Sequence, residues 1–219
     1  MQYIDKAVEE GLTSKDERTR VESSLRLDFK PTPEQVDRGV ADKSWKVRQA
    51  WGIRTDFIPT PEQVERGLTD ADVYVRMAWG LRKDYTPTPE QIERGLTDKE
   101  WEVRQVWAGR DDFTPTPQQI ERGISDSSSA VRLVWAERMD WTPASDQIQR
   151  GLEDPEDAVC IAWILRKDFN PPLNYVERGL TMRNERIRSA WEKKVADLHA
   201  ESMHILACEE VYKGCSLQL

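Results

Sequence analysis

Both histidines and two of the three cysteines lie near the C-terminus, where they could bind a metal ion. These residues are His199, His204, Cys208 and Cys215. A helix would place His204 and Cys208, four residues apart, on one face, and imidazole and thiolate ligands suit zinc. The full spacing matches no standard zinc finger, however, and a capping helix with incidental histidines and cysteines explains the same residues. We therefore predict no metal site and keep these four residues as the alternative.

The sequence contains no recognisable catalytic or cofactor motif. It has no glycine-rich phosphate loop, no His-Glu-x-x-His pair, no nucleophile elbow and no Cys-x-x-Cys. A histidine-dependent triad is excluded outside the C-terminus because both histidines are there. Carboxylate catalysis stays open, since 40 acidic residues always offer plausible pairs. The prediction is a protein that is not an enzyme, with no catalytic residue and no cofactor.

The amino-acid composition limits the classes of partner that we expect this protein to bind. The 219 residues include 32 Lys and Arg against 40 Asp and Glu, a net charge of −8. This balance argues against sequence-independent nucleic-acid binding, which needs a surplus of basic residues. No apolar run approaches the roughly 18 residues that span a bilayer, the N-terminus does not resemble a secretory signal, and the cysteines do not suit a secreted disulfide framework. We expect a cytoplasmic protein with no direct nucleic-acid or membrane partner.

Several residue types recur at a fixed step of 28 residues, and this repeat decides the architecture. The glycines of the series are Gly11, Gly39, Gly67, Gly95, Gly123, Gly151 and Gly179. The tryptophans are Trp51, Trp79, Trp107, Trp135, Trp163 and Trp191. The series keep their phase without insertion, so the chain is built from one structural unit used seven times.

Each repeat predicts two short helices. In the third repeat, Thr60-Pro61-Glu62-Gln63 is typical of a helix start, with a threonine cap, proline in the first position and glutamine completing a capping box. Asp70 is expected to cap the second helix, on which Val75, Ala78 and Trp79 share one face. Helices this short are not stable alone in water. Stacking of neighbouring repeats must bury what each repeat leaves exposed.

We therefore predict an all-α protein, a right-handed αα solenoid of seven 28-residue helix-turn-helix repeats. Residues 1–200 form the solenoid, with repeats starting near residues 5, 33, 61, 89, 117, 145 and 173. Residues 201–219 lack the pattern and are expected to form a C-terminal cap or tail with a capping helix.

The periodic charged and aromatic residues are expected to be structural. The aspartates are Asp42, Asp70, Asp98, Asp126 and Asp154, and the matching arginines are Arg48, Arg76, Arg104 and Arg132. Paired carboxylates and guanidiniums between repeats explain this strict period better than a catalytic site, which is a single constellation. The tryptophans are predicted to be core, and the recurring glycine predicts close approach of a neighbouring helix.

The second helices carry a further stripe, opposite the core face, that is almost free of charge. Among twenty positions in five repeats, only Glu137 and Asp157 are charged. We name as partner-binding candidates Trp45, Gln49, Val73, Met77, Leu81, Trp101, Gln105, Leu133, Ile161 and Leu165, and call them the apolar stripe. A solvated face should be more polar, so the stripe is either a concave groove for a partner, a face packed inside a tightly curved superhelix, or a surface for homo-oligomers.

The pattern TPEQ-(Val/Ile)-ERGL-Thr-Asp followed by VR-x-x-W-x-x-R-x-D resembles the leucine-rich repeat variant and the broader HEAT-like repeats, as found in bacteria or phage, over residues 5–200. The resemblance implies a helical solenoid, and in HEAT-like repeats an aspartate and an arginine often form a ladder. The pattern is broken where Cys160 replaces the arginine, Ser145 and Leu173 replace the proline, and Met182 replaces the aspartate. Regular packing is expected to fade after about residue 143.

Three functions follow, in order of preference. The first is a non-enzymatic scaffold or adaptor that binds another protein or peptide through the apolar stripe. The second is an acidic, phage-type anti-defence inhibitor that occupies a nucleic-acid-binding site, although acidic clusters such as Asp111-Asp112 and Glu153-Asp154 are scattered. The third is a DNA-repair enzyme of the HEAT-like kind, which would need a basic concave surface that the sequence does not provide.

Overall fold

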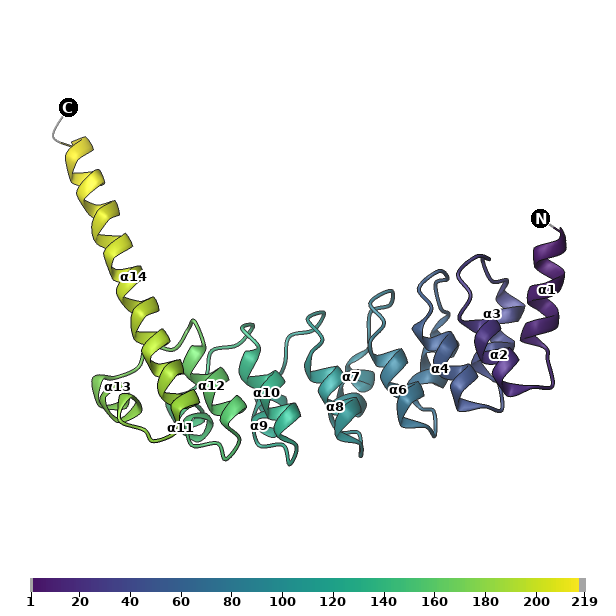
Figure 1. The fold of residues 1–219 in the computed structure, drawn as a ribbon, viewed down its shortest axis with the longest axis horizontal. Coiled ribbons are helices and arrows are strands. Elements are labelled where there is room, and N and C mark those ends of the chain that lie inside the picture. The colour runs from purple at the N-terminus through teal and green to yellow at the C-terminus, as the bar shows by residue number, and fades with distance from the viewer. Residues whose placement is uncertain (1, 217–219) are drawn as a thin grey trace. The chain divides into compact units, whose positions relative to one another are not determined.

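The computed structural model describes the backbone of residues 2–216 and the side chains of residues 6–200. Within these residues the chain has fourteen helices and no strand (Figure 1). The helices are α1 (Gln2–Leu12), α2 (Glu17–Ser24), α3 (Pro33–Val40), α4 (Trp45–Ile53), α5 (Pro61–Leu68), α6 (Val73–Gly80), α7 (Pro89–Leu96), α8 (Trp101–Ala108), α9 (Pro117–Ile124), α10 (Ser129–Glu137), α11 (Ser145–Leu152), α12 (Asp157–Leu165), α13 (Leu173–Leu180) and α14 (Glu185–Ser216). The all-α prediction and the helix pair in each repeat are confirmed.

The chain divides into two compact units. The N-terminal unit is Met1–Thr114 and contains α1 to α8, and the C-terminal unit is Pro115–Leu219 and contains α9 to α14. In both units, odd-numbered and even-numbered helices alternate as the first and second helix of each repeat. The last second helix, α14, is continuous to Ser216 and so includes most of the segment 201–219.

The first helices begin at the predicted Thr-Pro pairs. In α5, the Thr60 hydroxyl accepts a hydrogen bond from the backbone N–H of Gln63 at 3.3 Å, and the side-chain oxygen of Gln63 accepts one from the backbone N–H of Thr60 at 2.9 Å. The side-chain NH₂ group of Gln63 also donates to Asp37 of the preceding repeat at 2.7 Å. One glutamine therefore caps its own helix and holds the neighbouring repeat.

The second helices begin two residues later than a cap at the periodic aspartate would give. The Asp70 carboxylate accepts a hydrogen bond from the Asp72 N–H at 2.9 Å, and Asp72 is the N-cap of α6 through the Tyr74 N–H. The prediction that Asp70 caps this helix is therefore wrong. Asp70 orders the turn before the helix, because its short side chain reaches the backbone two residues ahead.

The tryptophans form the core, as predicted. Trp79 is fully buried, and its indole lies against Gly67 of α5 in the same repeat. A Cβ at Gly67 would lie 2.1 Å from the Trp79 ring, so only glycine allows this approach. A mid-helix glycine costs about 1 kcal/mol relative to alanine. Burial of a large aromatic ring more than offsets that cost.

The predicted arginine–aspartate ladder is present within each unit. Arg76 donates two hydrogen bonds to the Asp98 carboxylate, at 2.7 and 2.8 Å, and one to the Asp70 carbonyl of its own repeat at 2.9 Å. The hydrogen bonds with Asp98 raise the pKa of Arg76 against the opposing effect of burial. The equivalent pairs are Arg20–Asp42, Arg48–Asp70 and Arg132–Asp154. These side chains join repeats and are not an anion-binding surface.

A second arginine series is buried in the core, with a role that the sequence did not predict. Arg82 is 4% exposed and pairs in bidentate fashion with Asp84. It also donates to the carbonyls of Gly52, Arg54 and Phe57 in the preceding repeat. The arginine thereby satisfies the Gly52 and Arg54 carbonyls at the end of α4, which have no partner within that helix, and the Phe57 carbonyl in the loop that follows. The sequence signal for this role is the aspartate that follows each of these arginines by two residues, as Asp84 follows Arg82.

Candidate functional site

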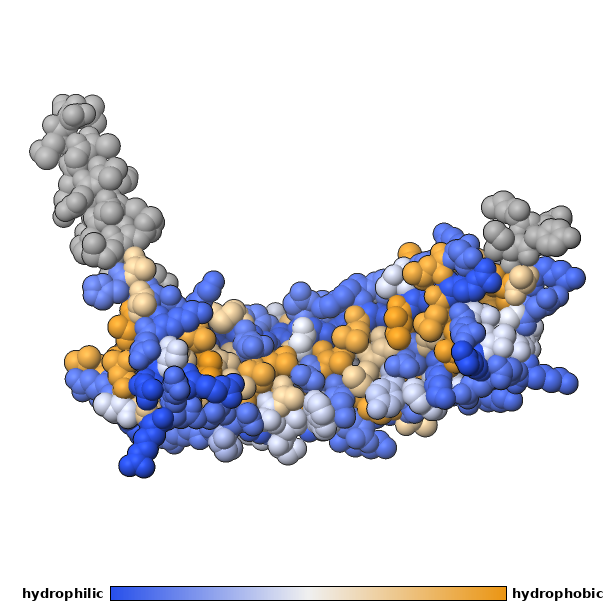
Figure 2. Space-filling view, viewed as in Figure 1, coloured by the Kyte–Doolittle hydropathy of each residue, from blue (hydrophilic) through white to orange (hydrophobic). Residues whose placement is uncertain are grey.

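The apolar stripe of the N-terminal unit is partly open to solvent. Leu81 is 61% exposed and Trp101 is 41% exposed. The other stripe residues of this unit are intermediate in exposure: Trp45, Gln49, Val73, Met77 and Gln105. The Trp45 ring stacks on Tyr74, with centroids 5.4 Å apart and planes at 26°. The stripe is therefore not sealed inside this unit, and Figure 2 shows hydrophobic side chains gathered over α4 and α6.

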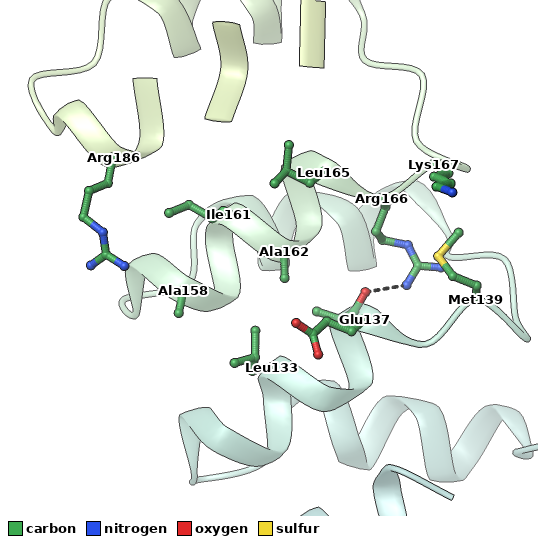
Figure 3. Close-up of a pocket in the computed structure, with 11 residues that line it drawn as sticks. Leu133, Glu137, Met139, Ala158, Ile161, Ala162, Leu165, Arg166, Lys167 and Arg186 are labelled. Atoms are coloured by element: carbon green, nitrogen blue, oxygen red, sulfur yellow. Dashed lines mark hydrogen bonds between the residues drawn. The ribbon is translucent and has the colours of Figure 1, made fainter. Parts of the chain in front are cut away.

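In the C-terminal unit the stripe residues Leu133, Ile161 and Leu165 line a pocket of about 510 Å³. Leu133 lies on α10, and Ile161 and Leu165 lie on α12 (Figure 3). Ala136, Ala158 and Ala162 also line it, and their small side chains leave the space between these two helices open. The pocket is thus an apolar cavity with a floor of small residues, of a size that suits large side chains or a small ligand.

Polar groups stand at the edge of this pocket. Glu137 at the end of α10 and Lys167 after α12 are both exposed. Arg166 is already fully used, because it donates to the carbonyls of Ala136 and Arg138, each at 2.8 Å, and pairs with Asp168. Figure 3 shows Glu137 beside Leu133 and Lys167 at another edge.

Sequence reasoning named three of the residues that line the pocket and missed others. Met139, Lys167 and Arg186 are pocket residues outside the apolar stripe. Met139 and Lys167 lie in loops that follow second helices, and Arg186 lies in the first turn of α14. Arg186 also lies 3.7 Å from Asp157, the only acidic residue of α12. Only the packing of α14 against α12 brings it to the pocket.

The metal-ligand candidates remain a prediction for the most part. His199 is exposed on α14, whereas the side chains of His204, Cys208 and Cys215 lie outside the described residues. Among the side chains that the structure describes, no group of three His, Cys, Asp or Glu residues could hold a metal ion. In the same part of the chain, no helix has both the length and the apolar character needed to cross a membrane.

Cys160 is a buried structural residue. Burial raises the pKa of its thiol to about 11, and the sulfur lies 3.2 Å from the Leu152 carbonyl oxygen. It belongs to an apolar cluster with Ile164, Phe169 and Trp191. A thiol that is protonated at neutral pH and covered in this way is a poor nucleophile.

Comparison with known proteins identifies the fold. No protein-family model and no curated protein matches the chain. The chain is similar to a solved structure described as a leucine-rich repeat variant with a novel repetitive protein structural motif. The TM-score is 0.53 at 21% identity, over 87% of this chain and 81% of that chain. The chain is a helical repeat solenoid that resembles the leucine-rich repeat variant. At this identity the likeness shows the fold alone.

Proposed function

We propose that this protein is a non-enzymatic scaffold or adaptor that binds another protein or a peptide through its apolar stripe. The observation that carries the proposal is the partial exposure of an almost uncharged face on the second helices, with a pocket where the stripe lies in the C-terminal unit. Interfaces between proteins are depleted of charge at their centre and use aromatic residues, methionine and pockets as anchors. The stripe has each of these features.

The charged residues favour this proposal over an acidic inhibitor that mimics a nucleic acid. Asp112 pairs with Arg110, Asp111 with Lys83, and Asp154 with Arg132. These carboxylates already have cationic partners within the fold, so they offer less uncompensated negative charge than the sequence suggests. An electrostatic mimic depends on such charge for its field.

The test is a capture experiment from a lysate of the source cell with paired variants. Met77→Lys and Leu133→Lys, made together, should leave the helical circular dichroism and the thermal transition close to wild type, because both side chains are partly exposed. The captured partner should be lost, since an unpaired charge in an interface is costly. Reversal of the exposed acidic residues Asp111, Glu153 and Glu156 should have a smaller effect.

Three outcomes would contradict the proposal. Unfolding of the Met77/Leu133 variant would place the stripe inside the solenoid. The opposite rank order, with steep loss of binding in salt, would favour the acidic inhibitor. If the captured protein were the chain itself, size-exclusion chromatography would show a concentration-dependent homo-oligomer and the stripe would be its interface.

A further inference from the structure

The pocket of the C-terminal unit differs from the rest of the apolar stripe in carrying charge without an internal partner. Glu137 occupies the position that is Ile53, Leu81 and Leu165 in other repeats. It is exposed and makes no ion pair with any side chain that the structure describes. An acid thus stands at the edge of a cavity lined by leucine, isoleucine and alanine.

Lys167 is the second charge without a partner. Its equivalent in the third repeat, Lys83, forms an ion pair with Asp111 of the next repeat. The residue that corresponds to Asp111 for Lys167 is Val195, which has no charge. Lys167 is exposed and lines the pocket without an ion pair in the described part of the chain. Lys167 therefore lacks the carboxylate in the next repeat that Lys83 has in Asp111.

The other cations near the pocket do not neutralise Glu137. Arg166 is held by Asp168 and by carbonyls of the preceding repeat. Arg186 lies 3.7 Å from Asp157 on α12. The pocket thus combines an apolar floor with one open acidic position on α10 and one open basic position after α12. This arrangement can orient a bound segment as well as hold it, because charges at a rim set register and direction.

We infer that the pocket binds a peptide segment of a partner protein that inserts large apolar side chains and places a Lys or Arg beside Glu137 and an Asp or Glu beside Lys167. A cavity of about 510 Å³ exceeds the volume of one leucine or phenylalanine side chain, so it accepts more than one anchor. This inference rests on the proposed function and assigns the chemistry of its partner.

A displayed library of random 12-residue peptides, selected on the full chain, tests the inference. Enriched peptides should share bulky apolar residues with a Lys or Arg within four positions. Their dissociation constants would be measured by fluorescence polarisation against purified variants. Ile161→Lys should weaken binding at least about tenfold, and Glu137→Gln about threefold to tenfold. Glu177→Gln removes an exposed carboxylate on α13 outside the pocket and should leave binding unchanged.

A charge exchange sharpens the test. A selected peptide whose basic residue is changed to Glu should bind wild type poorly and regain affinity for Glu137→Lys. The inference is overturned if no peptide is enriched, or if binders ignore both Glu137→Gln and Ile161→Lys. Binders that are lost with Met77→Lys but kept with Ile161→Lys would place recognition on the N-terminal stripe. That result would sink the pocket assignment and leave the proposed scaffold function standing.

Discussion

Trp101 and Trp107 lie on the same helix, α8, and have different roles. Trp107 is 1% exposed and packs on Gly95, where a Cβ would lie 2.2 Å from the indole ring. Trp101 belongs to the apolar stripe and is 41% exposed. One residue type therefore supplies the core on one face of the helix and a candidate binding surface on another. The 28-residue period distinguishes the core tryptophan from the stripe tryptophan, because tryptophan recurs in six repeats only at the position of Trp107.

Substitution of these two tryptophans should separate the roles. Trp107→Ala should lower the free energy of unfolding by about 3–5 kcal/mol, because a large buried side chain leaves a cavity. Trp101→Ala should cost less, about 1–2 kcal/mol, because 41% of this residue is already exposed to solvent and less apolar surface is lost from the fold. Urea denaturation followed by circular dichroism measures both. Similar losses for the two variants would show that the stripe is packed as tightly as the core.

At the scale of the helical elements, the contacts between the sixth and seventh repeats differ from those between earlier repeats. The arginine and the aspartate that would pair across this boundary are both replaced, by Cys160 and Met182. An apolar cluster that includes Cys160, Ile164 and Trp191 packs there instead. Lys194 stands at the position that the buried arginines, such as Arg82, occupy in earlier repeats, and it donates to the Arg166 carbonyl at 2.7 Å. The helices α11 to α13 nevertheless keep their pairing, so the expected loss of regularity after residue 143 appears as lost ion pairs and not as lost helices.

Restoring the arginine and the aspartate at this boundary tests whether the two residues of each ladder pair stabilise the fold together. Cys160→Arg alone should destabilise the protein, because it places an unpaired charge in a buried position. Addition of Met182→Asp should recover stability, with a coupling free energy of about 1–3 kcal/mol in a double-mutant cycle. Met182→Asp alone changes a partly exposed residue and should have a small effect. Strictly additive free energies of unfolding would show that the apolar packing prevents the pair from forming.

Across the molecule, carboxylates on the first helices join neighbouring repeats within each unit. Glu65 accepts hydrogen bonds from Gln91 at 3.1 Å and from Arg94 at 2.6 Å, and these lower its pKa against the effect of burial. Hydrogen bonds from Arg150 and Gln147 lower the pKa of Glu121 in the same way. The same kind of contact thus recurs in both units, and stability is spread over many interfaces between neighbours.

These lowered pKa values predict a loss of stability in acid. A carboxyl group with a folded-state pKa below its unfolded value stabilises the fold above the unfolded pKa, and this contribution is lost as the pH falls through the folded pKa. Urea midpoints should therefore fall between about pH 5 and pH 3. Glu65→Gln should flatten this dependence, and 0.5 M salt should weaken it, since the pairs are half-exposed.

The sequence by itself determined the repeat, the helix pair and the tryptophan core. These features are local or strictly periodic: Thr60, Pro61 and Gln63 define a helix start within four residues, and Trp79 recurs in phase with Gly67. It also predicted that Arg76 would pair with an aspartate, because the arginine series and the aspartate series both recur at the same 28-residue step. The position of the N-cap at Asp72 was missed by two residues, since either aspartate satisfies the same local rule.

Tertiary structure alone decided the role of Arg82 and the openness of the apolar stripe. The carbonyls that Arg82 reaches lie 25 to 30 residues away in the chain. The exposure of Leu81 and the pocket beside Ile161 depend on how far apart adjacent second helices pack and on the residues that loops and α14 bring to their edge. Residue spacing fixes which face of a helix a side chain occupies. The distance between that face and the next helix comes from the side chains packed between them.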